Sequence, residues 1–218
     1  MNVYSSETEQ VDQIKRWIKA YALPVIVGVI VASALTFGWR YWQEKQEQKA
    51  IEASSYYEQM QIDLMQKNDN GVNRQARYLL EQYADTPYAS FAAFALAQQA
   101  VQRGDFKAAI QQLNWVIDEG KDAAFQQIAQ IRLARVLISI QEAEKALEVL
   151  QKIRDESFMG GIEETRGDAY LSLNKTEAAR AAYQKSLKTM PPSSPMYAFI
   201  QMKLNQLAQP TILKEATK

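Results

Sequence analysis

The 218-residue chain contains no histidine and no cysteine. Without them it lacks the commonest general base, the thiol nucleophile, any disulfide, and the imidazole and thiolate ligands of transition metals. The carboxylate pairs Asp155-Glu156 and Glu163-Glu164 are neighbours in sequence. Neighbouring residues do not face one another on a helix, so these pairs indicate solvated surface charge rather than an acid/base site. We therefore expect no catalytic residue, no metal site and no cofactor.

An excess of either charge is also missing. Lys plus Arg and Asp plus Glu number 25 each, and the isoelectric point is near 6.4. The chain therefore has no strongly basic field to attract a phosphate backbone. We expect no nucleic-acid binding.

Charged residues are absent from residues 20–39. Twenty apolar residues form a helix of about 30 Å, which matches the hydrocarbon thickness of a bilayer. A helix buried in a soluble protein is equally apolar, but the basic and aromatic flanks of this segment favour a membrane span. A cleavable signal peptide has a shorter apolar region and a small-x-small site, whereas this run continues into Arg-Tyr-Trp-Gln-Glu. We expect an anchor that stays attached.

Small residues recur along the predicted span. Gly28 with Ala32, and Ala34 with Gly38, have the small-xxx-small spacing that lets two membrane helices approach closely, although small residues that face lipid would look the same. Pro24 falls in the first turn of the predicted span, where its missing N–H breaks no hydrogen bond. The residues expected to serve the membrane anchor are Pro24, Gly28, Ala32, Ala34, Gly38, Trp39 and Trp42.

Residues 40–67 contain no proline or glycine and are rich in good helix formers, so this segment predicts a juxtamembrane helix that can continue the membrane helix. Apolar residues recur there at alternating spacings of three and four. Such a seam can pair with a second copy of the chain, but it covers only about two heptads, which favours packing on the next helix of the same chain. A homodimer through the anchor or this helix stays open. The seam consists of Ala50, Ala53, Tyr57, Met60 and Leu64.

The rest of the chain matches itself at a period of about 34 residues, which is typical of a tetratricopeptide-like helical array. The clearest unit spans residues 160–191, and more degenerate units precede it. Small residues fall where paired helices cross closely, and a proline ends the second helix. The positions of the pattern in the clearest unit are Gly167, Tyr170, Ala179, Tyr183, Ser186 and Pro191. A last helix, near 195–207, is expected to cap the array.

These patterns predict an all-α protein with an N-terminal transmembrane helix, a tetratricopeptide-like helical hairpin array of three to four pairs, and a C-terminal capping helix. The expected segments are an N-terminal cytoplasmic tail (1–19), a transmembrane helix (20–39), the juxtamembrane helix (40–67), the array (68–208) and a disordered tail (209–218).

Short motifs along nearly the whole chain carry a family resemblance. They include Glu9-Gln10-Val11-Asp12, Gly38-Trp39-Arg40-Tyr41-Trp42, Leu96-Ala97-Gln98-Gln99, Arg132-Leu133-Ala134-Arg135-Val136, Arg166-Gly167-Asp168 and Gln201-Met202-Lys203-Leu204-Asn205. In their order and spacing the chain resembles the YfgM family of ancillary subunits of the bacterial SecYEG translocon. The resemblance implies a single-pass inner-membrane protein with a cytoplasmic N-terminus and a periplasmic domain. It also implies association with SecYEG and the periplasmic chaperone PpiD, and help for newly translocated proteins. It offers no catalytic residue.

Charge by itself does not orient the anchor, because three Lys or Arg residues lie close to either end of the span. Our leading hypothesis is a scaffold whose groove docks a chaperone or translocated chains. Alternatives are a cytoplasmic adaptor for envelope regulation and, in another class, a hydrolase. The groove is expected on the first helix of each pair, although its apolar members can equally be core residues. Its expected residues are Phe94, Gln98, Val101, Ile131, Arg135, Ile138, Glu164, Asp168 and Leu171.

Overall fold

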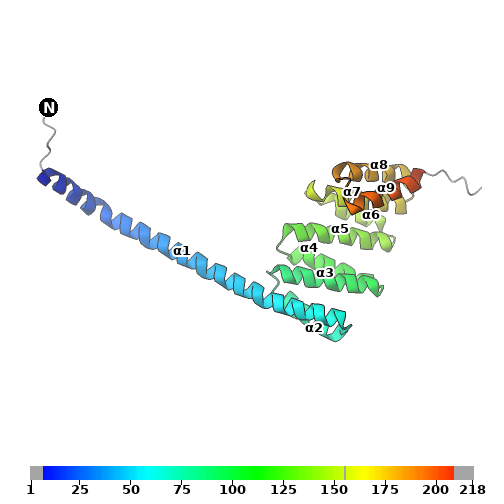
Figure 1. The fold of residues 1–218 in the computed structure, drawn as a ribbon, viewed down its shortest axis with the longest axis horizontal. Coiled ribbons are helices and arrows are strands. Elements are labelled where there is room, and N and C mark those ends of the chain that lie inside the picture. Colours follow the sequence, from blue (N-terminus) through cyan, green and yellow to red (C-terminus); the bar gives the residue numbers. More distant parts are fainter. Residues whose placement is uncertain (1–6, 155, 209–218) are drawn as a thin grey trace, which may run out of the picture. The chain divides into compact units, whose positions relative to one another are not determined.

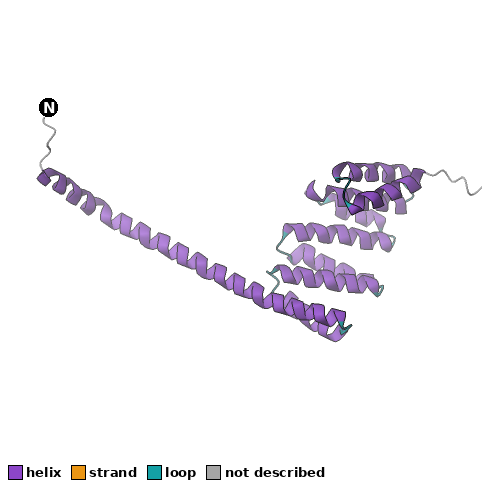
Figure 2. Ribbon diagram, viewed as in Figure 1, coloured by secondary structure: helices purple, strands orange, loops and turns teal. Residues whose placement is uncertain are grey.

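The structure is a computed structural model that describes residues 7–154 and 156–208. Within these ranges all regular elements are helices, which confirms the predicted all-α class (Figures 1 and 2). The helices are α1 (Glu7–Met65), α2 (Asp69–Gln82), α3 (Pro87–Gln102), α4 (Phe106–Glu119), α5 (Ala123–Ser139), α6 (Ala143–Gln151), the short 3₁₀ helix η1 (Glu156–Phe158), α7 (Met159–Ser172), α8 (Thr176–Thr189) and α9 (Pro195–Ala208). The predicted tail at 209–218 and the first six residues of the predicted N-terminal tail lie outside the described residues.

The chain divides into two compact units, residues 1–51 and 52–218. In the first unit, helix α1 already begins at Glu7, before the predicted span. Pro24 therefore lies inside the helix, and its expected place in the first turn is wrong. A proline in a helix interior removes one backbone hydrogen bond, here the bond to the carbonyl of residue 20. Membrane helices tolerate this loss better than soluble helices do.

The apolar segment of α1 is the one helix in the described part of the chain that is long and apolar enough to cross a membrane. Its large side chains are exposed on the isolated chain, as Leu23, Leu35 and Phe37 illustrate at 73%, 70% and 71%. A contiguous apolar surface of this length suits a lipid environment better than water.

The second unit begins inside α1, at Glu52. The end of α1 and the following α2 form a hairpin, in which Ala53 and Met60 are fully buried against Leu79. The Tyr83 hydroxyl donates a hydrogen bond of 2.9 Å to the Glu52 carboxylate. Burial and this hydrogen bond raise the pKa of Tyr83 to about 12. Four of the five seam residues, Ala53, Tyr57, Met60 and Leu64, thus pack within their own chain.

The later helices form hairpins joined by short turns. Gly104 ends the turn after α3 at φ 74°, a conformation that suits glycine because it has no Cβ. The Asp105 side chain then accepts a hydrogen bond from the Ala108 N–H, which caps α4. In the same way the Asp122 side chain caps α5 through the Ala124 N–H.

The first helices of successive hairpins lie side by side: α3 contacts α5, and α5 contacts α7. We call their common surface the α3–α5–α7 face. The second helices pack behind it, and Figure 1 shows α4 and α6 behind α3 and α5. The helices of the last hairpin, α7 and α8, cross closely at Gly167. A Cβ at this position would overlap the Tyr183 ring. Helix α9 packs on α8 and closes the array.

Candidate functional site

A groove of about 830 Å³ opens between the end of α1, α3 and α5. We call it the main groove. Its wall carries an aromatic row in which the ring centroids of Tyr57 and Phe91 are 5.8 Å apart, and those of Phe91 and Phe125 are 5.1 Å apart. Phe94 continues the row, 6.4 Å from Phe125 and edge-on to it. Such rings supply large apolar contact area at a low cost in conformational entropy. The remaining lining residues are Gln61, Leu64, Lys67, Asp69, Ala95, Gln98, Gln99, Gln102, Arg103, Ile128 and Arg132.

A smaller cavity of about 390 Å³ adjoins the main groove. We call it the side cavity. Its apolar wall is aliphatic and consists mainly of Ala97, Val101, Leu113 and Val136. The two spaces share the lining residues Phe94, Gln98, Gln102 and Arg132. They therefore form one surface, aromatic on one side of these four residues and aliphatic on the other.

The guanidinium of Arg132 marks the boundary between the two spaces. It lies over the Phe94 ring, 4.5 Å from the ring centroid, in a cation–π contact. Among the described residues it forms no ion pair, whereas Arg103 pairs with Asp69 and Arg135 pairs with Glu164. Burial and then the like charge of Arg135 lower the pKa of Arg132.

Two side-chain amides on α3 accompany Arg132. Gln98 and Gln102 are four residues apart, so they lie on one face of the helix and line both spaces. Both are exposed and make no hydrogen bond to the rest of the described chain. The neighbouring Gln99, in contrast, donates a hydrogen bond of 3.0 Å to Asp69.

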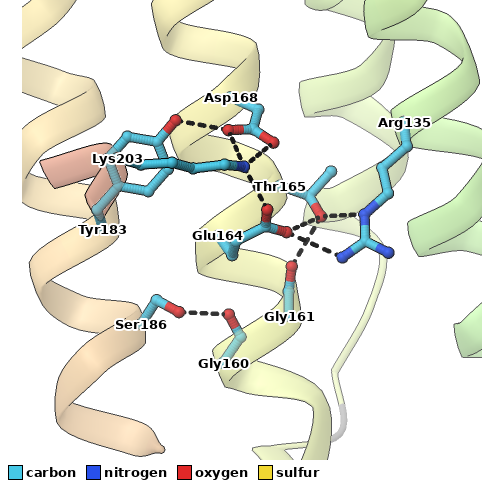
Figure 3. Close-up of polar contacts among 9 residues, drawn as sticks. All are labelled: Arg135, Gly160, Gly161, Glu164, Thr165, Asp168, Tyr183, Ser186 and Lys203. Atoms are coloured by element: carbon cyan, nitrogen blue, oxygen red, sulfur yellow. Dashed lines mark hydrogen bonds and ion pairs between the residues drawn. The ribbon is translucent and has the colours of Figure 1, made fainter. Parts of the chain in front are cut away.

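Beyond the side cavity, three helices are joined by a cluster of charged residues (Figure 3). The Glu164 carboxylate on α7 lies 2.9 Å from the Arg135 guanidinium on α5 and 2.6 Å from the Lys203 ammonium on α9. Thr165 adds to the cluster by accepting a hydrogen bond from Arg135. Burial would raise the pKa of Glu164, but the hydrogen bonds and charges of Lys203 and Arg135 outweigh it and hold that pKa below its ordinary value.

The same ammonium reaches a second carboxylate. Lys203 Nζ lies 2.7 Å from both oxygens of Asp168, and the Tyr183 hydroxyl donates to Asp168 Oδ1 at 2.5 Å (Figure 3). Burial raises the pKa of Asp168 and the charge of Glu164 adds to this, while the hydrogen bonds from Lys203 and Tyr183 oppose it. Burial and the bond to Asp168 likewise raise the pKa of Tyr183.

The predicted groove residues fall into different environments. Phe94, Gln98, Val101 and Arg135 come together and line the side cavity. Ile131 is only 7% exposed and belongs to the core. The remaining members lie apart from both spaces: Ile138 packs on the core, Glu164 and Asp168 bind Lys203, and Leu171 is exposed.

Several lining residues were missed by sequence reasoning, above all Arg132, Gln102 and Phe125. One signal was present, because Arg132 and Arg135 are three residues apart and must share a helix face. Phe125 gave no such signal, since its position depends on how α5 packs beside α3. Lys203 was expected on a capping helix but not as a partner of Glu164.

The geometry of stacked hairpins and an open groove agrees with comparisons to known proteins. A family model described as a tetratricopeptide repeat-like domain matches residues 15–209. The protein of Haemophilus influenzae named ancillary SecYEG translocon subunit is 30% identical over 185 residues, which cover 81% of this chain and 90% of that protein. The chain belongs to this family.

Further members of the family match over almost their whole length. The ancillary SecYEG translocon subunit of Escherichia coli (strain K12) is 29% identical over 210 residues, covering 95% of this chain and 100% of that protein. The protein of the same name from Aggregatibacter actinomycetemcomitans is 29% identical over 205 residues, with 94% and 99% covered. Membership in the family confirms the expected tetratricopeptide-like fold, and the relatives are named as translocon subunits and not as enzymes.

Proposed function

We propose that the chain is a membrane-anchored scaffold of the Sec translocon that docks partner proteins through the main groove and side cavity. The proposed partners are SecYEG, a PpiD-like periplasmic chaperone and newly translocated proteins. The observation that carries the docking role is the open surface on α3 and α5. There, aromatic and aliphatic walls adjoin the Gln98 and Gln102 amides and the Arg132 guanidinium, which have no hydrogen-bond or ion-pair partner among the described residues. Helical arrays use concave surfaces of this kind to bind peptide segments.

The anchoring role is supported by the apolar part of α1. Its length suits a bilayer, and aromatic side chains gather at both ends. Trp17 and Tyr21 have ring centroids 5.8 Å apart at one end, and Trp39 and Trp42 have centroids 5.4 Å apart at the other. We therefore assign the lipid bilayer as the first partner of the chain and the bacterial inner membrane as its location.

The proposed orientation has the N-terminus in the cytoplasm and the second unit in the periplasm. Protease added to intact spheroplasts should digest residues 52–218 only if they are periplasmic. Protection until the inner membrane is opened would favour the alternative, a cytoplasmic adaptor.

Small residues on α1 are candidates for contact between two copies. A Cβ at Gly28 or at Gly38 would meet no described atom within 4 Å, so both positions are open on the single chain. We propose a homodimer through this surface as an additional arrangement, since small residues let membrane helices approach closely. Cysteines placed at Gly28 and Gly38 should cross-link two chains in membranes, and the absence of any cross-link would exclude this contact.

Docking can be tested by photo-cross-linking in native membranes. A photoreactive residue in place of Gln98, which lines both spaces, should yield adducts with a translocon subunit, a PpiD-like chaperone or translocated chains. The matched control is the same residue in place of Gln111, which is exposed on α4 and lines neither space. Equal adducts from both positions, or none from Gln98, would exclude docking in this groove.

A further inference from the structure

We propose that the main groove and side cavity recognise an extended segment of a partner protein that presents an Asp or Glu side chain to Arg132. Apolar side chains before and after this acidic residue would occupy the two spaces. The inference rests on the proposed docking function and adds the chemistry of the segment that is docked.

The preference for an acidic residue follows from the charges on the surface. The lining residues carry Lys67, Arg103, Arg132 and Arg135 against a single carboxylate, Asp69. Asp69 pairs with Arg103, and Glu164 on α7 pairs with Arg135. The Arg132 guanidinium has no anionic partner in the described part of the chain and lies 4.5 Å from the centroid of the Phe94 ring. A planar guanidinium beside apolar walls binds a carboxylate bidentately and strongly.

The preference for apolar neighbours follows from the walls on either side of Arg132. On one side lies the aromatic row, in a groove of about 830 Å³. On the other side, Val101, Leu113 and Val136 line a cavity of about 390 Å³. The two spaces meet at Arg132, so apolar side chains on both sides of one acidic residue can be buried together.

The preference for an extended segment follows from Gln98 and Gln102. Each amide offers two donors and an acceptor, and neither makes a hydrogen bond within the described chain. A helical partner satisfies its own backbone groups internally, apart from its ends. An extended segment leaves its N–H and C=O groups free, and two amides four residues apart on α3 can bind them.

The test selects binders from a random peptide library with the full chain in nanodiscs of neutral lipid. Wild-type protein should enrich peptides with Asp or Glu between apolar residues. For the selected peptides, Arg132→Gln should lower the affinity about tenfold, which corresponds to about 1.4 kcal/mol. Arg132→Lys keeps the charge but loses the planar fork, and it should cost less. Arg74→Gln, at an exposed position on α2 outside both spaces, should leave the affinity unchanged.

Two failures can be told apart with Val101→Asp, which places a charge at an exposed position in the side cavity. If binding is lost in Val101→Asp but acidic peptides are not enriched and Arg132→Gln binds normally, the acidic preference is wrong and docking stands. If neither variant changes binding, the groove is not the site and the proposed function falls as well. If anionic vesicles bind in an Arg132-dependent way and no peptide is enriched, the ligand is a lipid headgroup and the inference is overturned.

Discussion

The ammonium of Lys203 on α9 lies 2.6 Å from the carboxylate of Glu164 on α7, thirty-nine residues earlier in the chain. The same ammonium contacts both oxygens of Asp168 at 2.7 Å, and only 18% of the Lys203 side chain is exposed. Partly buried ion pairs therefore hold the last helix, α9, against α7 of the α3–α5–α7 face. On α7, the sequence suggested Glu164 and Asp168 for partner binding. Both form ion pairs with Lys203 of the same chain.

We expect Lys203→Met to destabilise the second unit. Glu164 retains Arg135, and Asp168 remains partly hydrated, so the loss should be about 2 kcal/mol rather than the larger cost of a fully buried orphan charge. Chemical denaturation of the full chain measures it. Lys188→Met, at an exposed position on α8, should change the free energy of unfolding by less than about 0.5 kcal/mol. Equal stability of the two variants would contradict a structural role for the Lys203 ion pairs.

The contribution of Glu164 should depend on pH. Its pKa in the folded protein lies below the ordinary 4.5, so the unfolded chain takes up the proton first as the pH falls. The stabilisation is complete above about pH 4.5 and is lost as the pH drops through the folded pKa. We expect the free energy of unfolding of the wild type to exceed that of Glu164→Gln by about 2 kcal/mol at neutral pH. This difference, measured by chemical denaturation, should shrink in acid.

Asp168 is present in both the wild type and Glu164→Gln. Its pKa is raised in the folded protein, so its effect on the pH dependence of stability is opposite to that of Glu164. Glu177→Gln serves as the control, since the Glu177 side chain is 83% exposed and should make almost no contribution at any pH. A wild-type advantage over Glu164→Gln that is independent of pH would show that the carboxylate charge is not what stabilises this cluster.

Gly167→Ala should destabilise the last hairpin by about 2 kcal/mol or more, because the new methyl group would overlap the fully buried Tyr183 ring. Gly161→Ala on the same helix is the matched control. There the added Cβ would make ordinary contact with Ile131 at 3.8 Å, and the better helix propensity of alanine should leave stability unchanged or higher. Thermal unfolding distinguishes the two, and equal melting temperatures would contradict the close crossing of α7 and α8.

Met60→Ala should cost about 2–5 kcal/mol, as expected for a fully buried methionine. The nearby Met65 is 76% exposed, and Met65→Ala should have little effect. Hydrogen exchange of α2 in the two variants gives the measurement. If α2 is equally protected in both, the end of α1 is not part of the first hairpin.

Much of the fold follows from local patterns. An uncharged run of twenty residues indicates a membrane helix, and small residues such as Gly167 and Ala179 at fixed offsets indicate paired helices, because helix crossing and bilayer thickness each impose their own spacing. The predicted place of Pro24, in the first turn of its helix, was wrong. Helix α1 continues through residues that look like a polar tail, and nothing in a short window marks where it begins.

The candidate site was predictable only in part. Phe94, Gln98, Val101 and Arg135 follow from the inward positions of a helical repeat. Arg132 and Arg135 look alike in sequence. Only the packing of α7 beside α5 decides that Arg135 pairs with a carboxylate, while Arg132 pairs with none in the part of the chain that the structure describes.

The sequence by itself determined an apolar anchor, an all-helical array and the absence of histidine and cysteine chemistry, because composition and helical periodicity are local properties. Only the tertiary structure decided which charges are neutralised within the chain, since Lys203 reaches Glu164 and Asp168 through the packing of α9. The energy of an ion pair depends on the distance between side chains that are remote in sequence, and folding alone sets that distance.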